Sequence, residues 1–336
     1  VISSRVMIAL ATYVHSLNPV LVEFPGTPLS VRWYGLAYVC GFLLGYWALL
    51  QLSRRRLYCV PADKLGDFIT WVCLLGVLVG GRLGEFFFYW LPEQGLSGFL
   101  EDPTWVFRVW EGGMASHGGM LGVLLVALVY ARRHKLSFPG VLDGLAIVAP
   151  IGLFFGRLAN FINGELFGRV TSPDNPLAMK FPQELYSMDL PQLREAVFAA
   201  QASGGTDAPI TSTSMLIDLC RTNETVRAAV EPFLSCRWPS QLFEAAGEGL
   251  LLFLVLIIVR LKWKDAPAGT FCAIFCFVYA AARIATECFK EPDAGVWFGV
   301  TQGQLLSLGL VLLGLGFARA ACGNAKAKKS LSEQKM

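Results

Sequence analysis

Long apolar runs alternate with short polar connections along most of this chain. A helix needs about 20 consecutive apolar residues to cross a bilayer. Seven runs approach or exceed this length, and the third is the shortest. They predict membrane-spanning helices over residues 31–50, 68–89, 114–131, 141–161, 240–259, 269–288 and 302–320. The pattern therefore predicts an all-α polytopic membrane protein, with one transmembrane helical domain over residues 1–320.

Basic residues gather in every second connection between these runs. The clusters fall at residues 54–64, 132–135 and 260–264, and again in the tail at 319–329. Connections rich in Lys and Arg stay on the cytoplasmic side of a membrane. The N-terminus is therefore expected outside and the C-terminus in the cytoplasm, as an odd number of helices requires. The polar, basic segment 321–336 is expected to be a disordered cytoplasmic tail.

The longest polar segment, residues 164–239, lies on the outer side in this orientation. A loop of that length without structure of its own is uncommon. We expect an inserted extracytoplasmic cap, helical around residues 191–201 and 223–234. The segment contains Cys220 and Cys236, and an oxidising compartment would permit a disulfide between them. The sequence leaves that pairing open.

Composition agrees with a membrane protein and narrows the chemistry. Of 336 residues, 54% are hydrophobic and 16% are charged, whereas a soluble domain carries about 25% charged residues. The net charge of +3 is small and concentrated in short loops, which argues against a nucleic-acid partner. The nine cysteines show no CxxC spacing, so we expect no metal site.

Polar and ionisable side chains recur at the outer ends of the predicted helices. Such groups are expensive at membrane depth and normally face a bundle interior or a wet cavity. Asp143 is the exception, at the inner end of the fourth helix. The outer set comprises Tyr34, Arg82, Glu85, His117, Arg157, Asn160, Glu244, Glu248, Arg283 and Glu287.

Plain structural explanations exist for individual members of this set. Arg157 could be a helix-end arginine that reaches the headgroups. The pairs Arg82–Glu85 and Arg283–Glu287 could be salt bridges that only hold the bundle together. Their shared level nevertheless favours a polar chamber that opens toward the outer leaflet. A transporter places its site near the midplane, and a channel needs polar residues through both leaflets.

The residue types in the chamber point to a phospholipid substrate. Guanidinium groups are planar forks that suit a phosphate and stay charged when desolvated. His117 lies among Gly112, Gly113, Gly118 and Gly119, and a histidine titrates in the range that suits proton transfer. We therefore expect a membrane enzyme that acts on a phospholipid from its outer face.

The motif GRLANFINGELFGRV at residues 156–170 resembles the signature of the prolipoprotein diacylglyceryl transferase family. Further matches follow in the family's order, from about residue 31 to 316, and only the cap at 171–237 matches poorly. They are RWYGLAYVCGF, RVWEGGMASHGG, PSQLFEAAGEG, ARIATECFKEPD and GQLLS.

This resemblance implies an activity and a set of site residues. The family transfers the diacylglyceryl group of phosphatidylglycerol to the lipobox cysteine thiol of a prolipoprotein. A thioether forms, glycerol 1-phosphate leaves, and no metal or cofactor is required. The resemblance implies a bacterial inner-membrane enzyme whose site faces the outer leaflet. Its functional residues fall on Tyr34, His117, Arg157, Asn160, Glu165, Gly168, Arg283 and Glu287.

The resemblance also implies a division of roles among these residues. Arg157, Arg283 and His117 would be catalytic, with the arginines on the phosphate. Tyr34, Asn160, Glu165, Gly168 and Glu287 would bind substrate. His117 is the natural base for the thiol, although arginine charge that lowers the thiol pKa could suffice. The alternatives are a phospholipid-binding or lipid-translocating protein without catalysis, and a purely structural bundle.

Overall fold

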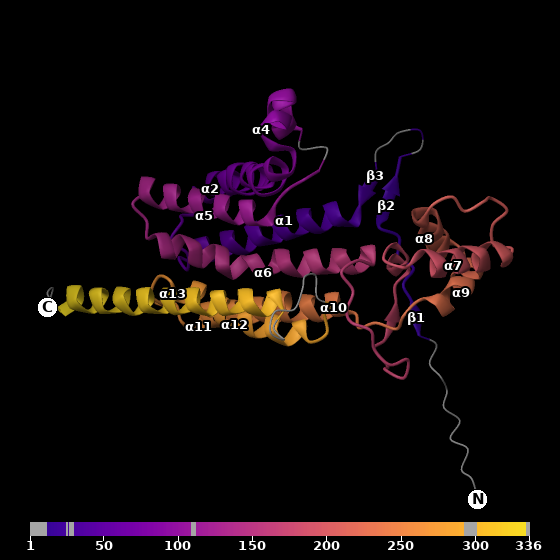
Figure 1. Ribbon diagram of the computed structural model, residues 1–336. Helices are drawn as coiled ribbons and strands as arrows, with labels where there is room; N and C mark the ends of the chain where they lie inside the picture. The colour runs from indigo at the N-terminus through magenta and orange to yellow at the C-terminus, as the bar shows by residue number, and fades with distance from the viewer. Residues whose placement is uncertain (1–11, 25, 27–29, 109–111, 292–300, 334–336) are drawn as a thin grey trace, which may run out of the picture. The chain divides into compact units, whose positions relative to one another are not determined.

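The computed structural model describes residues 12–24, 26, 30–108, 112–291 and 301–333 (Figure 1). The chain divides into two compact units. The first, unit 1, contains Val1–Phe42, Pro150–Leu252 and Val278–Leu310. The second, unit 2, contains Leu43–Ala149, Phe253–Phe277 and Val311–Met336.

Six helices in the described part of the chain are long and apolar enough to cross a membrane. This confirms the predicted all-α polytopic membrane protein. The label η marks π-helical stretches and 3-10 turns. Four of the six helices have a single label: α1 (Trp33–Arg54), α6 (Phe138–Asn163), α12 (Thr270–Glu287) and α13 (Gln302–Glu333). The fifth runs without a break through α2 (Leu65–Trp71), η1 (Val72–Val79), α3 (Gly80–Glu85) and η2 (Phe86–Trp90) into α4 (Leu91–Glu101). The sixth consists of α10 (Ser240–Glu244), η7 (Ala245–Leu251) and α11 (Leu252–Lys262).

The seventh predicted span is present as a helix but is less apolar than the other six. This helix, α5 (Ser116–Arg133), has only 18 residues. It begins with a histidine and two glycines and ends on two arginines, which lower its mean hydropathy. Length and composition therefore identify six membrane-spanning helices, and α5 is less hydropathic than any of them.

In unit 2, α5 packs closely against the long helix that contains η1 and α3. Gly76, Gly80 and Gly84 recur every four residues on that helix, and Gly118 and Gly122 do so on α5. A Cβ at Gly118 would overlap the backbone of Gly80 and Gly84. Glycines at this spacing let two membrane helices approach backbone to backbone. These five glycines, here called the glycine seam, therefore set the register of α5.

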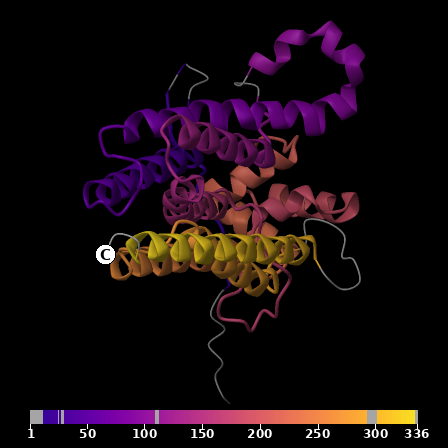
Figure 2. The same ribbon diagram turned by 90° about the vertical axis from the view of Figure 1, so that its left-hand side faces the viewer.

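The long helix of unit 2 changes direction at Gly95, which has a φ of +70°. Glycine adopts this conformation without a Cβ penalty. Figure 2 shows this part of the chain, coloured purple, bending away from the line of the preceding helix. A 3-10 turn, η3 (Pro103–Phe107), then leads the chain toward α5.

Asp143, the exception to the predicted pattern of outer polar residues, has a structural role. Its carboxylate accepts the backbone N–H groups of Gly269 at 2.7 Å and Cys272 at 2.9 Å. These donors lie at the N-terminus of α12, where helical N–H groups lack partners of their own. Asp143 thus caps α12 from a different helix, which explains its burial.

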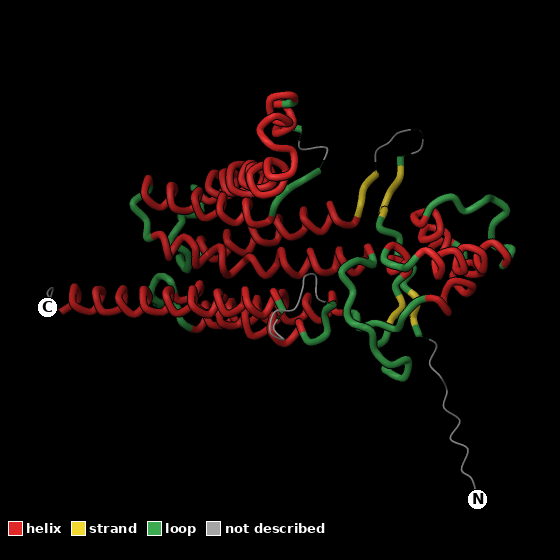
Figure 3. Tube along the Cα trace, in the orientation of Figure 1, coloured by secondary structure: helices red, strands yellow, loops and turns green. Residues whose placement is uncertain are grey.

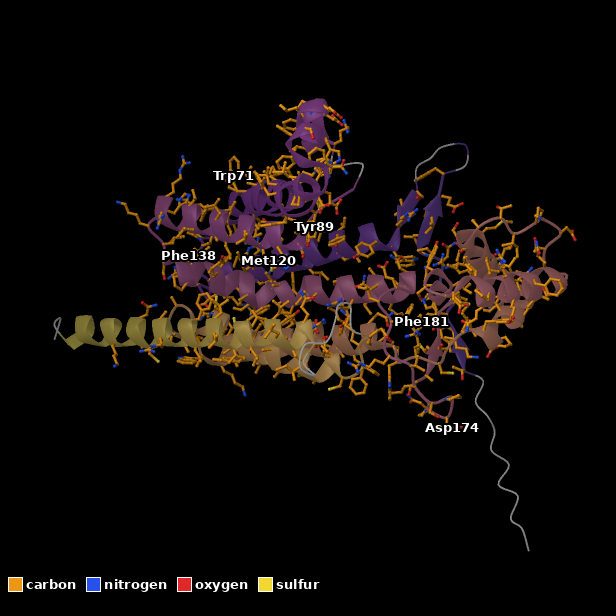
Figure 4. The ribbon with its side chains drawn as sticks, in the orientation of Figure 1. Trp71, Tyr89, Met120, Phe138, Asp174 and Phe181 are labelled. Atoms are coloured by element: carbon orange, nitrogen blue, oxygen red, sulfur yellow. The ribbon has the colours of Figure 1, made fainter. Side chains whose placement is uncertain are left out.

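Large apolar side chains cover the outer surface of the membrane-spanning helices. Trp71, Tyr89 and Met120, labelled in Figure 4, are about half exposed at 51%, 47% and 58%. In water such a surface would be unfavourable, but lipid tails are as apolar as these side chains. The exposed apolar surface is therefore consistent with contact to lipid.

The strands and cap of unit 1 are small. Strands β1 (Tyr13–Val14) and β4 (Met179–Lys180) pair in parallel, and β2 (Val20–Glu23) pairs antiparallel with β3 (Ser30–Arg32) (Figure 3). The cap contains the 3-10 turns η5 (Pro182–Tyr186) and η6 (Glu231–Phe233). Its helices α7 (Leu190–Ala202), α8 (Thr213–Thr222) and α9 (Glu224–Val230) lie together (Figure 1).

The cap has a hydrophobic core of its own. Leu185, Ala196, Leu216 and Val226 are among its buried residues. Helices α7 and α9 fall where the sequence predicted helix, whereas α8 was not predicted. Each begins at a capping side chain, namely Asp189, Ser212 and Asn223, which accepts otherwise unpaired N–H groups.

The disulfide that the sequence left open is not formed in the cap. Cys220 and Cys236 are both buried free thiols. Burial raises the pKa of Cys220 to about 12, so this thiol stays protonated at neutral pH. It belongs to the cap core and packs as a small apolar residue.

The C-terminal segment also differs from expectation. Helix α13 continues to Glu333, through most of the segment 321–336 that was expected to be disordered. Ala and Lys are good helix formers. They extend a helix that the preceding apolar residues have already nucleated, so the costly first turn is not needed again.

The buried His15 predicts a pH-dependent stability of the cap. His15 is 1% exposed and lies 5.4 Å from Phe161 and 5.5 Å from Phe181, measured between ring centroids. Figure 4 labels Phe181. Burial lowers the pKa of His15 from 6.5 to about 4. The folded state holds the neutral ring, so its stabilising effect is complete above pH 6.5 and declines as pH falls toward 4.

The shift corresponds to about 3 kcal/mol at the acid end. We expect amide hydrogen exchange in η5 and β4, corrected for intrinsic rates, to speed up between pH 6.5 and 4. The His15→Gln variant should lack this pH dependence. Equal acid responses in the two proteins would contradict the assignment.

Candidate functional site

Two arginines and three glutamates from three helices of unit 1 form one ionic cluster. Arg157 comes from the C-terminal half of α6, Glu244 and Glu248 from α10 and η7, and Arg283 and Glu287 from α12. Five ion pairs join them: Arg157 Nε–Glu244 Oε2 at 3.2 Å, Arg157 Nη2–Glu248 Oε2 at 3.5 Å, Arg283 Nη1–Glu244 Oε1 at 2.7 Å, Arg283 Nη1–Glu248 Oε1 at 3.2 Å and Arg283 Nη2–Glu287 Oε2 at 3.1 Å.

Helix spacing explains why these groups meet. Glu244 and Glu248 are four residues apart, as are Arg283 and Glu287, and residues four apart share a helix face. Thr286 Oγ1 donates to Glu248 Oε1 at 3.1 Å and satisfies a further lone pair. Gly249, on the next turn, lets η7 approach the backbone of Phe154 in α6. The close approach brings the glutamates within reach of Arg157.

The cluster has an inner and an outer layer. Both Glu244 and Glu248 side chains are fully buried, at 0% exposure, whereas those of Arg157 and Arg283 are 19% and 13% exposed. Buried carboxylates need such partners, because desolvating an unpaired charge is costly. The arginines are thus held from behind by carboxylates and keep an open side.

Donor accounting shows what that open side offers. A guanidinium has five N–H donors. Among contacts within the described part of the chain, Arg157 uses Nε and Nη2, and Arg283 uses Nη1 and Nη2. Arg157 Nη1 and Arg283 Nε remain as donors for a ligand. Donors of this kind bind phosphate or carboxylate oxygens.

The charge count constrains any such ligand. With all five groups ionised, two positive charges face three negative ones, which leaves the cluster with a net charge of −1. An anion that binds the open donors of the arginines therefore also meets the negative charge of the three carboxylates, which weakens its binding. The cluster is thus a weaker anion site than a pocket that held the two arginines alone.

A second group of polar side chains lies at the end of α6, also in unit 1. Asn160 Nδ2 donates to Glu165 Oε1 at 2.9 Å and to the Tyr34 hydroxyl at 3.5 Å. Gln241 Nε2 donates to the Glu165 carbonyl at 2.7 Å, which ties the following loop to α10. The structure thus brings together three of the residues that the resemblance assigned to substrate binding, namely Tyr34, Asn160 and Glu165.

Gly168 has a packing reason for lacking a side chain. Its N–H donates to the Trp238 carbonyl at 2.9 Å, and a Cβ there would overlap the carbonyl oxygen of Phe289. Only glycine fits between these two backbone segments. Its predicted role in binding substrate remains untested, whereas its role in joining the loop to α10 and α12 follows from the contacts.

His117 belongs to unit 2 and is described with that unit. It is the second residue of α5 and is exposed. Of the two salt bridges proposed as structural alternatives, Arg283–Glu287 is present at 3.1 Å. Arg82 instead donates to backbone carbonyls of the segment before α5.

Sequence reasoning placed Glu244 and Glu248 in the same polar set as the site residues but assigned them no role in the site. Their four-residue spacing was the available signal, because it places both on one face. It did not reveal that the same carboxylates contact two arginines from different helices. Thr286 and Gln241 were missed altogether, since a single hydroxyl or amide in an apolar run carries no pattern.

Comparison with known proteins identifies what the chain is similar to. A sequence profile described as prolipoprotein diacylglyceryl transferase matches residues 19–319. Three curated relatives, each named phosphatidylglycerol–prolipoprotein diacylglyceryl transferase, align over most of both chains. The relative from Bdellovibrio bacteriovorus is 38% identical over 90% of this chain and 92% of its own. Those from Caulobacter vibrioides and Rhodospirillum rubrum are 40% and 39% identical, over 85% and 89% of this chain and 86% and 90% of their own.

The charge count predicts unequal roles for the three carboxylates. Removing Glu287 leaves two arginines facing two glutamates, and Glu244 and Glu248 each still contact both arginines. We expect Glu287→Gln to change the melting temperature in detergent only slightly. The double variant Glu244→Gln/Glu248→Gln leaves Arg157 without a carboxylate, and breaking such buried pairs costs about 3–5 kcal/mol.

The measurement is the thermal unfolding midpoint of both variants in the same detergent. A matched control is Asp218→Asn, which removes a carboxylate that pairs with Arg221 on the cap surface and is 69% exposed. If Glu287→Gln and the double variant lowered the melting temperature equally, the ion pairs of Glu244 and Glu248 would not be the ones that stabilise the cluster.

Proposed function

The chain belongs to the prolipoprotein diacylglyceryl transferase family, and we propose that its arginine–glutamate cluster binds the lipid phosphate during the reaction. The protein is a multi-pass membrane transferase that moves a diacylglyceryl group from phosphatidylglycerol to a prolipoprotein. The observation that supports the cluster as the phosphate site is the pair of partly exposed guanidiniums with unused donors. Both lie in motifs that the family shares.

The bond changes in the proposed reaction explain why arginines suit this site. A cysteine thiolate of the precursor attacks the terminal glycerol carbon of the diacylglyceryl group, where a C–S bond forms. The C–O bond to phosphate breaks, and glycerol 1-phosphate leaves with the electron pair. The phosphate changes from a diester with one negative charge to a monoester with nearly two. Arginines therefore bind the transition state more strongly than the substrate, as catalysis requires.

The buried carboxylates have a function in this scheme as well. Without ligand they hold both guanidiniums in place, so little ordering is needed when the lipid binds. As the phosphate gains charge, it competes better with the glutamates for the same donors. The excess negative charge of the cluster also weakens binding of the finished product, which favours its release.

The thiol must lose its proton before it attacks, because the thiolate is the nucleophile. His117 is the proposed base, and a positioned histidine contributes about 10²–10⁴-fold to such a step. The alternative is that the charge of the arginines lowers the thiol pKa enough without a base. The precursor's lipobox cysteine is the proposed acceptor in both cases.

The remaining site residues support the lipid. Tyr34 and Asn160 present a hydroxyl and an amide to the glycerol backbone and headgroup, while Glu165 orients Asn160. Glu287 orients Arg283 from the same helix. Gly168 keeps the loop after α6 close to α10, so that the loop residues stay beside the arginines.

The proposed orientation follows the basic connections. The N-terminus faces outward, the C-terminus lies in the cytoplasm, and the site opens toward the outer leaflet of a bacterial inner membrane. Basic residues at the inner ends of α5 and α11 support this orientation. The cap then lies outside the membrane, on the side where a translocated precursor arrives.

We expect Arg157→Lys and Arg283→Lys to lower kcat by about 10²–10³-fold, the usual loss when one stabilising donor is removed. Lysine keeps the positive charge but lacks the planar arrangement of N–H donors that binds two phosphate oxygens at once. The measurement is release of glycerol phosphate from phosphatidylglycerol by purified protein with a lipobox peptide. A Cys→Ser peptide should give no release. Arg133→Ala, at the exposed end of α5, serves as the matched arginine control. Near-normal rates in both lysine variants would refute the phosphate assignment.

A further inference from the structure

Arg82 is a buried arginine whose donors all go to backbone carbonyls before α5. It is 2% exposed and lies in α3 of unit 2. Each of its five N–H groups has a carbonyl partner in residues 105–108 or 112–113. Nε donates to Val106 at 3.0 Å, Nη1 donates to Gly112 and to Gly113 at 2.9 Å, and Nη2 donates to Trp105 at 2.6 Å and Arg108 at 3.0 Å.

This arrangement excludes Arg82 from direct binding of an anion. A guanidinium has five donors, and all five are used. Its plane also lies against the Trp105 ring, with 3.8 Å between Cζ and the ring centroid, which is a favourable cation–π distance. Arg82 thus acts on the segment before α5 and has no donor left for a phospholipid.

The segment that Arg82 holds leads directly into the residue proposed as the base. Gly113 is four residues before His117. Ala115 N–H donates to the Gly81 carbonyl at 3.0 Å, one residue before Arg82. Immediately after His117, Gly118 enters the glycine seam against Gly80 and Gly84. The start of α5 is therefore fixed to α3 on both sides of His117.

We infer that Arg82 is a positioning residue of the transfer reaction, which acts through the segment that carries His117. The inference rests on the proposed role of His117 as the base. Five charge-assisted hydrogen bonds to carbonyls fix the approach of the chain to α5. A small misplacement of a catalytic group costs a large factor in rate. The cost falls on kcat, because the phosphate-binding arginines belong to other helices.

Two variants weaken the contact between Arg82 and the segment before α5, one by changing Arg82 and the other by changing the segment. Arg82→Met removes all five hydrogen bonds while keeping an unbranched apolar side chain. Gly113→Ala leaves Arg82 in place, but its Cβ would lie 3.1 Å from Arg82 Nη1 and 3.2 Å from Glu85 Cγ. It therefore disturbs the same contact without removing a buried charge, and remains informative if Arg82→Met fails to fold.

A control separates this effect from the general loss of an arginine. Arg55→Ala removes an exposed arginine from the connection after α1. It should keep kcat within about threefold of wild type, as surface changes usually do.

The experiment is a double-mutant cycle with His117→Asn, which measures kcat and KM for phosphatidylglycerol in the glycerol phosphate assay. Alone, Arg82→Met and Gly113→Ala should lower kcat about 10-fold or more, up to the loss in His117→Asn, since general-base help is worth about 10²–10⁴-fold. KM should change little. In the His117→Asn background both should cost almost nothing, because groups that act as a unit are not additive.

Equal losses in the two backgrounds would overturn the inference, because an additive effect shows that Arg82 does not act through His117. A raised KM with unchanged kcat would overturn it too. If His117→Asn has the wild-type rate, His117 is not the base and the inference fails, while the arginine variants still test the phosphate site. If wild-type protein releases no glycerol phosphate, the proposed function itself fails.

Discussion

The pairing of two arginines with three buried glutamates is the interaction on which the candidate site depends. Charged groups at membrane depth are stable only when they are paired and hydrogen-bonded. Here Glu244 and Glu248 contact both arginines, so neither guanidinium can move without breaking contacts on another helix. The cluster ties α6, α10 and α12 together and fixes where a phosphate would bind.

The same pairing gives the site its chemical character. A fully positive pocket would bind phosphatidylglycerol and the departing glycerol phosphate tightly and release the product slowly. In the proposed reaction, a cluster with one excess negative charge would bind anions less tightly and would respond to the charge that develops as the C–O bond breaks. The open donors of Arg157 and Arg283 are where that response would occur.

Much of this organisation could be predicted from the sequence. Apolar runs marked the six long helices, because crossing a bilayer imposes a length and a composition. The positions of Arg157, Asn160, Arg283 and Glu287 along the apolar runs marked them as candidates without help from the family. Motif resemblance then added Glu165 and Gly168, which lie beyond the end of α6.

Other features depend on three-dimensional contacts that no pattern encodes. The donors of Arg82 go to carbonyls up to 31 residues away in the chain, whereas its sequence neighbour Glu85 had suggested a salt bridge. Helix α8 has only 10 residues, so its amphipathic pattern covers too few turns to stand out between two polar stretches. Asp143 looked anomalous until its carboxylate was seen to cap α12.

The most direct test of the phosphate site is equilibrium binding of labelled glycerol 1-phosphate to purified protein in detergent. The account predicts saturable binding that unlabelled glycerol does not displace and that Arg157→Lys and Arg283→Lys weaken. It also predicts tighter binding to Glu287→Gln, because that change removes the excess negative charge. Binding that is unaffected by either lysine variant, or weaker binding to Glu287→Gln, would contradict the account.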